Sequence, residues 1–499
     1  MDSNNVTGDS GGVLQAHSVH AGTISFGGAA RGPGFGSAEA PWARLAGQVH
    51  GRDGIVADLV AEVRSAQPSV IVLHAGGGYG KTTVALSVCR AVRDAFSVRW
   101  VDASTSSSLL EGLREVALAA GAEPRRVREA WDGRASAPAV LWAALSTASP
   151  SWLLVLDNTD DLSVLTGPDG LIDGRGWLRT PPPGCTLLIT TRDGRPEPWP
   201  ESAARHRLHQ LPEPDGAAML KGLCPTAGDD LAAGSLSRCL GNLPLALWLA
   251  GRYLRNARTI PLVPGLDVPR TFGEYEAAWR DRSVELTDQV DRSAGPRAQL
   301  SSAWEISLEL LADQGHEYAR PILRLLSFFS PAPIPHDVLD AQVLAAEPVF
   351  HGLTARTMAT TLARLRGAGL LGSVGGGKLP TCVALHPVIR DVTRAQPDVA
   401  SHHSGYGLSV ARLLTRHAEH LVHAELTDNE AYASLFLLHA RQSLLEQVDH
   451  SPASCAVTAA LLDAIACIVE NGEQGSGNAE VLRKGARRIR TLVAGSGGK

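Results

Sequence analysis

A glycine-rich run that ends in a lysine and two threonines carries the clearest chemistry in this sequence. Residues 75–83 read Ala-Gly-Gly-Gly-Tyr-Gly-Lys-Thr-Thr and follow the short apolar run Val70–Leu73. Glycines at a helix N-terminus let backbone N–H groups point at a phosphate without interference from side chains. In such a loop Lys81 reaches the β and γ phosphates, and the Thr82 hydroxyl binds Mg²⁺. The run therefore predicts a site for a nucleoside triphosphate.

The match to the pattern G-x-x-x-x-G-K-[ST] has one departure, because Ala75 stands in place of its first glycine. The departure is mild, since a strand-like run precedes the loop and helical spacing follows it. The residues predicted to hold the nucleotide phosphates are Gly76, Gly77, Gly78, Tyr79, Gly80, Lys81, Thr82 and Thr83.

An acid at the end of a second apolar run is predicted to complete the magnesium site. Asp157 follows Leu153–Leu156, and an acid in this position can hold the metal together with Thr82. A lone aspartate after a strand is also a common turn or helix cap. Asn158 stands where many hydrolytic relatives of this fold carry a second acid, and an amide cannot accept a proton from the attacking water. We therefore expect slow hydrolysis, unless Asp160 or Asp161 substitutes.

An arginine ends a third apolar run, Thr186–Ile189, in the sequence Thr190-Thr191-Arg192. It would lie at the edge of the sheet where nucleotides bind in such folds, and a guanidinium can contact a γ-phosphate through two hydrogen bonds. Asp157 and Arg192 are thus the predicted catalytic residues. The simpler alternative for Arg192 is a surface ion pair.

The elements that must position these residues are short strands separated by helical stretches, which calls for an α/β fold with a parallel sheet covered on both faces. The predicted strands are Val70–Leu73, Val98–Val101, Leu153–Leu156, Thr186–Ile189 and Arg205–Leu211.

The sequence beyond the sheet predicts further modules. A helical domain is expected over residues 213–315. Over 316–398, helices precede Leu370-Leu371, a Gly375-Gly376-Gly377 turn and Cys382–Leu385, which together predict a winged-helix domain. Residues 399–499 are predicted to be helical, either docked helix pairs or a degenerate tetratricopeptide-like unit, and the last helix is basic.

The predicted nucleotide domain spans 46–212. Residues 1–45 are Gly- and Ser-rich and read as flexible, although Val13–Phe26 resembles a weak strand pair.

Composition limits the partners. A chain of 499 residues needs several domains, and 44% hydrophobic with 19% charged residues is typical of a globular protein. A net charge of −5 gives no overall attraction to nucleic acid or anionic membrane, so any such binding must be local. Seven scattered cysteines, the lack of a signal sequence and the lack of a membrane-spanning apolar run predict a cytoplasmic protein.

The order of these motifs resembles the NB-ARC branch of the STAND P-loop ATPases, and the resemblance implies the actinobacterial type, a bacterial protein. Separately, Arg far outnumbers Lys, and Ala and Gly are abundant, which fits a GC-rich genome. The resemblance covers about residues 49–395. Val49-His50-Gly51-Arg52 resembles the V-G-R motif on the adenine side, and Gly241-Asn242-Leu243-Pro244-Leu245 resembles the G-L-P-L motif, whose proline packs near the adenine. Leu385-His386-Pro387 resembles the winged-helix motif whose histidine touches the β-phosphate of ADP. Arg52, Pro244 and His386 are therefore predicted cofactor-binding residues.

The resemblance implies a switch that binds ADP or ATP with Mg²⁺ and serves signalling, regulation or defence. In the closed state, ADP and His386 would tie the winged-helix domain to the nucleotide domain. In the open state, Arg192 would read the γ-phosphate, and the chain would form a homo-oligomer in response to an unknown ligand or protein. Hydrolysis would be that of a weak ATPase. The inserted His50, and a histidine motif that lacks its usual following aspartate, depart from the family pattern.

Two alternatives stay open. One is a DNA-binding transcriptional regulator that uses the winged helix or the basic C-terminal helix. The winged-helix segment holds several arginines and several acids, so the sequence shows no face of a single charge. These residues are Arg356, Arg364, Arg366, Arg390, Asp337, Asp340, Glu347 and Asp391. The other alternative is an ATP-hydrolysing motor or kinase, against which Asn158 and the lack of a substrate-site motif argue.

Overall fold

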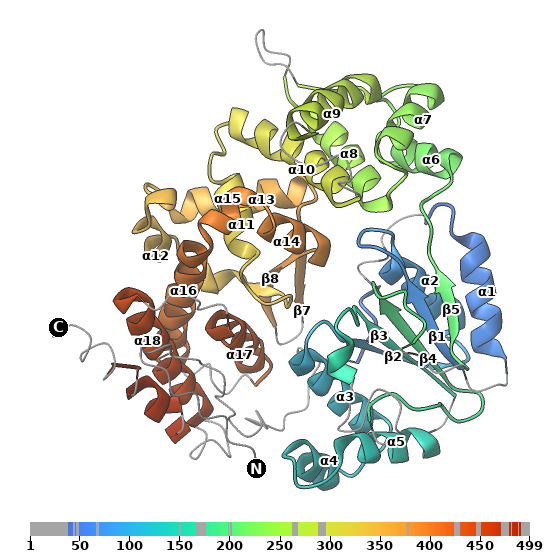
Figure 1. The fold of residues 1–499 in the computed structure, drawn as a ribbon, viewed down its shortest axis with the longest axis vertical. Helices are drawn as coiled ribbons and strands as arrows, with labels where there is room; N and C mark the ends of the chain where they lie inside the picture. Colours follow the sequence, from blue (N-terminus) through green and yellow to red (C-terminus); the bar gives the residue numbers. More distant parts are fainter. Residues whose placement is uncertain are drawn as a thin grey trace, which may run out of the picture.

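The computed structural model of the protein describes residues 38–490, apart from residues 43–44, 46–48, 66–68, 149–150, 166–175, 198, 200–201, 262–267, 288–295, 377–378, 424–429, 446–450, 471–478, 481 and 488. The sheet domain, the helices that follow it in the chain, a middle module and the C-terminal helices follow one another around the molecule (Figure 1). The predicted strand pair at 13–26 and most of the predicted flexible segment lie outside the described residues.

Five parallel strands form the sheet of the first domain, in the order β2-β3-β4-β1-β5. This confirms the predicted parallel sheet with flanking helices. The strands are β1 (Ser69–His74), β2 (Ser97–Asp102), β3 (Trp152–Asp157), β4 (Thr186–Thr191) and β5 (Ala204–Arg207). The last strand is shorter than predicted, because the chain beyond Leu208 leads to Pro212, the N-cap of the next helix.

Alternate residues of the central strands β1, β3 and β4 are buried on opposite faces of the sheet. Val70 and Val72 of β1 join the core on one face, whereas Ile71 and Leu73 join the core on the other. Residues of α3 (Ser106–Ala119), α4 (Pro124–Trp131) and α5 (Ala137–Thr147) line the first core, and those of α1 (Asp53–Arg64) and α2 (Lys81–Val92) line the second. Continuous apolar strands follow from this double burial, since neither face meets water.

After the sheet, the chain forms helices that pack on one another. They are α6 (Glu213–Leu223), α7 (Asp230–Cys239), α8 (Pro244–Ala257), α9 (Phe272–Thr287) and α10 (Pro296–Asp313). Pro244 begins α8, where its missing N–H costs no helical hydrogen bond.

Residues 319–394 form what we call the hairpin module, in which helices surround a three-stranded antiparallel sheet of order β6-β8-β7. Its elements are α11 (Ala319–Leu326), β6 (Ile334–Pro335), α12 (Ala341–Ala345), α13 (Ala355–Gly367), β7 (Leu371–Gly376), β8 (Leu379–Leu385) and α14 (Pro387–Arg394). The predicted pairing of the strand after Leu370 with Cys382–Leu385 is confirmed.

The C-terminal region is helical where it is described. It contains α15 (Pro397–Ser401), α16 (His403–His423), α17 (Glu430–Leu445) and α18 (Pro452–Glu470). Its core is continuous with that of the hairpin module and of α6–α10, as one cluster of buried residues from Leu211 to Leu482. Among the described residues, every helix is too short or too polar to pass through a lipid bilayer.

Candidate functional site

The glycine-rich loop turns from the end of β1 into the start of α2. Gly78 and Gly80 adopt the left-handed region, with φ of 83° and 89°, which glycine enters without steric cost. Gly80 is the N-cap of α2, and Lys81 and Thr82 are the first residues of that helix. Thr83 follows in the same turn and accepts a hydrogen bond from Ser87 at its carbonyl. The loop thus has the strand–turn–helix setting that phosphate binding requires.

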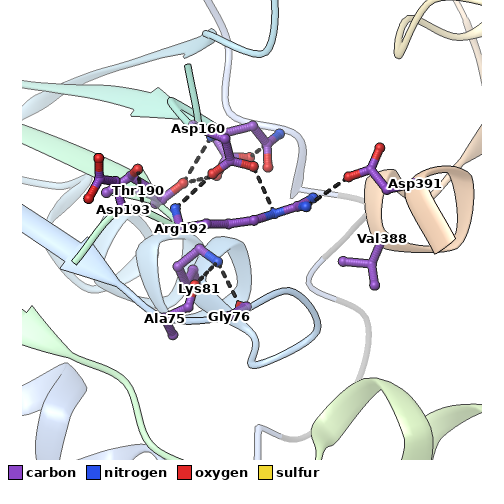
Figure 2. Close-up of polar contacts among 12 residues, drawn as sticks. Ala75, Gly76, Lys81, Asp160, Thr190, Arg192, Asp193, Val388 and Asp391 are labelled. Carbon is purple, nitrogen blue, oxygen red and sulfur yellow. Dashed lines mark hydrogen bonds and ion pairs between the residues drawn. The ribbon is translucent and has the colours of Figure 1, made fainter. Parts of the chain in front are cut away.

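Lys81 is held beneath the loop. Its side chain is buried, and Nζ donates to the carbonyls of Ala75 at 2.8 Å and Gly76 at 2.9 Å (Figure 2). Burial lowers the pKa of Lys81 to about 8, against the raising effect of the nearby Asp160 carboxylate. A buried ammonium whose acceptors are backbone carbonyls is suited to exchange them for phosphate oxygens, because charge-assisted hydrogen bonds are stronger than neutral ones.

Asp157, Thr82 and Thr190 meet where β3 and β4 end beside α2. The Thr82 hydroxyl lies 3.0 Å from Asp157 Oδ1, and the Thr190 hydroxyl donates to the same oxygen at 2.6 Å. Asp157 is 1% exposed. A buried carboxylate next to a threonine hydroxyl is the oxygen donor set that magnesium prefers, so these residues fit the predicted metal site.

Asn158 is locked in place by its neighbours. Its φ of 63° is in the left-handed region, and its N–H donates to the Thr190 hydroxyl at 3.0 Å. Its side-chain amide points at Asp157 Oδ2, at 3.4 Å. The amide therefore supports the position of Asp157, the predicted metal ligand, and no carboxylate occupies the place of the second acid.

Arg192 joins the sheet to the hairpin module. Its Nε contacts Asp160 Oδ2 at 2.8 Å, and its backbone N–H donates to Asp160 Oδ1 at 2.7 Å. Its Nη1 donates to Asp391 Oδ2 of α14 at 2.7 Å, across 199 residues of sequence. Figure 2 shows the guanidinium extended from the edge of β4 between the two carboxylates. Arg192 therefore forms an ion pair, which was the simpler alternative from the sequence. Its second partner, Asp391, lies on the hairpin module.

Two further contacts bring distant segments onto the loop. A Cβ built at Gly77 would lie 2.6 Å from Cγ2 of Val388, so α14 packs directly against the loop backbone. The N–H of Leu245, next to Pro244, donates to the carbonyl of Gly78 at 3.2 Å. The loop is therefore contacted from β1, from α8 and from α14.

His386 lies at the N-cap of α14, two residues before Val388. Its side chain is exposed, and Nδ1 accepts the N–H of Val388 at 3.2 Å. The resemblance assigned it to the nucleotide, and the structure places it on the helix that touches the loop. Its contact with a β-phosphate stays a prediction.

Arg52 connects Tyr79 of the loop to the chain that follows β5. Arg52 Nη2 donates to the carbonyls of Tyr79 at 3.1 Å and His209 at 2.7 Å, and burial lowers the pKa of Arg52 while Asp215 raises it. The Tyr79 ring packs on both the sheet core and the core of the helical modules. Tyr79 therefore connects the two halves of the molecule at the loop itself.

The sequence did not identify Asp391, Val388 and Leu245 as site residues. Asp391 was visible as one acid among several in its segment, but nothing local links it to Arg192. Val388 and Leu245 each follow a motif residue, His386 and Pro244, so their proximity to recognised motifs was the available signal.

Comparisons with known proteins find a relative by sequence. No protein-family model matches the chain. Over 279 residues, 53% of this chain, the sequence is 26% identical to a nucleotide-binding leucine-rich repeat (NLR)-like protein of Hyaloscypha variabilis, of which the match covers 27%. The chain thus spans about a quarter of that relative's length.

A crystal structure of a Signal Transduction ATPase with Numerous Domains (STAND) protein with a tetratricopeptide repeat sensor, from Pyrococcus horikoshii, matches with a TM-score of 0.40 and 13% identity. That match covers 89% of this chain and 64% of the other. The NLR-like relative confirms the resemblance to NB-ARC proteins of the STAND group. The actinobacterial type stays a prediction.

Proposed function

We propose that the protein is a switch that binds ADP or ATP with Mg²⁺, and that the nucleotide controls whether the hairpin module stays on the sheet domain. The name of the NLR-like relative and the loop geometry both support nucleotide binding. The adenine base, the ADP-closed and ATP-open states, and a role in signalling, regulation or defence rest on the family resemblance.

The chain's own residues would hold the nucleotide as follows. The N–H groups of the loop and Lys81 would bind the β and γ phosphates, with Arg52 and Pro244 towards the adenine side. Thr82 and Asp157 would hold the magnesium ion, which neutralises phosphate charge when bound. His386 would contact the β-phosphate in the closed state.

The observation that carries the proposal is the position of Arg192 between Asp160 and Asp391. A γ-phosphate near the loop would offer Arg192 a more highly charged partner than the Asp391 carboxylate. Because the Arg192 and Asp391 side chains are 24% and 41% exposed, their ion pair contributes only about 0–1 kcal/mol, so a phosphate can compete with it. The nucleotide then acts through its different affinity for the closed and open states.

The γ-phosphate would compete with Asp391 for Arg192 through charge. The contacts of the loop with Val388 and Leu245 add a second route, because a movement of the loop also disturbs the packing of α14 and α8 on it. A loop that shifts to wrap a γ-phosphate changes the surface on which α14 packs. Packed interfaces resist gradual deformation and tend to separate as units. We infer that loss of the Arg192–Asp391 pair and of the Gly77–Val388 contact occur together, and that the hairpin module, which we interpret as a winged helix, then moves.

Hydrolysis in this proposal is slow. Asn158 cannot act as a base, and both oxygens of Asp160 are engaged by Arg192 in the closed arrangement. Asp160 becomes available to position water only if Arg192 leaves it.

The test is to identify the nucleotide that co-purifies, then to measure molecular mass and shape with ADP and with a non-hydrolysable ATP analogue. We expect retained ADP, a compact monomer with ADP, and an extended or oligomeric form with the analogue. Lys81→Ala is the control and should carry no nucleotide. A mass and radius that are the same with both nucleotides would contradict the switch, and rapid steady-state phosphate release would contradict slow hydrolysis.

A further inference from the structure

The outward face of α13 is a second surface with distinctive chemistry. Met358, Thr361 and Leu365 are buried in the hairpin module, so helical periodicity turns the opposite side to solvent. The exposed residues of this face are Ala355, Arg356, Ala359, Thr360, Ala363, Arg364 and Arg366. Small side chains thus occupy its middle, and arginines flank them.

The helices and the strand that pack against α13 carry no acid. α13 itself has no Asp or Glu, and neither do α11, α12 and β7, which pack against it, nor α8, which reaches its C-terminal end. Within the described residues, Arg356, Arg364 and Arg366 take part in no ion pair. Their charges are therefore available to a partner.

The acids that mixed with these arginines in the sequence are used elsewhere. Asp391 pairs with Arg192, and Glu347 forms an ion pair with Arg412 of α16. Asp340 caps α12 by accepting from the N–H of Gln342 at 2.7 Å.

Asp337, the remaining acid, faces the C-terminal helices. There it adds to the effect of burial in raising the pKa of Tyr432. Folding therefore directs these four acids to other partners and leaves the arginines of α13 in solvent.

The basic surface continues onto α8. Arg252 Nη2 donates to the carbonyls of Arg366 at 3.1 Å and Gly367 at 3.0 Å, and its guanidinium lies over the Trp248 ring at 5.4 Å. Arg255 is exposed on the next part of the same helix. The C-terminal end of α13 and the middle of α8 thus present one positive surface, fixed by this interdomain contact.

We infer that the outward face of α13 binds double-stranded DNA, with the helix in the major groove. The groove of B-form DNA is wide enough to admit an α-helix, and the alanines and Thr360 let the helix backbone approach its floor. The arginines would meet phosphates on either side. The deep, narrow major groove of an RNA duplex excludes a helix, and the face lacks the large apolar side chains that insert into membranes. This inference goes beyond the nucleotide switch and does not depend on it.

The test uses the full-length protein and a fluorescent mixed-sequence DNA duplex of about 30 base pairs, long enough for a complete site. Fluorescence anisotropy is measured over a salt series, for the wild type and for the triple variant Arg356→Ala, Arg364→Ala, Arg366→Ala. We expect the variant to bind at least about tenfold more weakly and the slope of log affinity against log salt to fall by about 2–3.

The matched control removes the same charge from another exposed helix. The triple variant Arg125→Ala, Arg126→Ala, Arg128→Ala in α4 should change DNA affinity by less than about twofold, because non-contacting charges act only through the screened long-range field.

Two further variants separate the effect of charge from that of side-chain size, because Glu and Gln are nearly equal in size. Ala363→Glu should weaken DNA binding by about tenfold or more, whereas Ala363→Gln should weaken it less. Far-UV circular dichroism checks that each variant is folded.

The inference is overturned by any of four results. The first is no DNA binding by the wild type at about 50 mM salt, where electrostatic binding is strong. The second is wild-type binding by the triple arginine variant of α13 or by Ala363→Glu, and the third is an equal loss in the α4 control. The fourth is tighter binding to an RNA duplex or to anionic vesicles than to DNA.

Discussion

Two helices of the hairpin module, α14 and α13, have opposite relations to the rest of the chain. α14 faces the sheet domain, where Val388 packs on Gly77 and Asp391 pairs with Arg192. α13 faces solvent, and its arginines have no acidic partner among the described residues. Polar groups that a chain satisfies internally hold its own modules together, whereas a cluster of like charges left unpaired indicates a partner. The module is thus able to serve the nucleotide site and an outside ligand from different faces.

The two faces also differ in the forces they use. The α14 contact combines one ion pair with close packing, and packing changes steeply with small displacements. The α13 face depends on charge, which acts over about 10 Å and weakens with salt. Changes at one face should therefore leave the other largely unaffected, and the following predictions test this.

The largest effect is expected from Lys81→Ala. Loss of the buried ammonium should weaken ADP and ATP binding by on the order of 100-fold or more, because charged hydrogen bonds contribute roughly 1.5–3 kcal/mol each. Isothermal titration calorimetry checks this. DNA binding through α13 should be unchanged; a loss of both would show that the two faces are not independent.

Gly77→Ala should loosen the closed arrangement. The added Cβ would lie 2.6 Å from Val388, a clash that costs about 1–3 kcal/mol unless α14 withdraws. Small-angle scattering should report a larger radius. Gly54→Ala, where a Cβ meets nothing within 4 Å, is the control.

The double variant Gly77→Ala with Val388→Ala should recover the compact form, because truncation of Val388 removes the clash. A radius that stays large in the double variant would place the effect of Gly77→Ala within the loop itself.

A third surface of the module, towards α17, should respond to acid. His439 is buried, its Nδ1 lies 2.8 Å from the Ser330 hydroxyl, and its Nε2 lies 2.9 Å from the carbonyl of Pro333. Burial lowers the pKa of His439 from 6.5 to about 4. As pH falls from about 6.5 to about 4, His439 takes up a proton in the unfolded chain but stays neutral in the folded state. The free energy of unfolding therefore falls in that window and does not depend on this histidine above it.

Thermal unfolding at about pH 7 and about pH 5 should thus show a smaller acid loss in His439→Gln than in the wild type. The exposed His402→Gln should retain the full loss. Equal losses in all three proteins would show that His439 does not control the acid sensitivity.

The smallest effect is expected from Asp391→Asn. Removing one partner of a partly exposed ion pair changes closure by about 0–1 kcal/mol, so ADP release should quicken by up to about fivefold. Stopped-flow release of a fluorescent ADP analogue measures this rate. Glu419→Gln, which breaks the exposed pair with Arg416, should leave it unchanged. A slower release in Asp391→Asn would contradict the role of Asp391 in holding the module closed.

The sequence by itself determined the loop, the strands around it and the edge at which Asp157 and Arg192 lie. These features follow from local patterns: glycines before a helix, apolar runs of strand length, and the fact that carboxyl ends of parallel strands meet at one edge. The hairpin of β7 and β8 was predictable for the same reason, since its strands are neighbours in the chain.

Only the tertiary structure decided what those residues meet. Arg192 and Asp391 are 199 residues apart, and no periodicity encodes their pairing. No local pattern predicts the packing of Val388 against Gly77 either, or the hydrogen bond from the N–H of Leu245 to the carbonyl of Gly78. The charges near α13 read as a mixture in the sequence, because the chain order does not say which side of a module each side chain faces. Packing sorted them, placing Asp391 against Arg192 and the arginines of α13 in solvent.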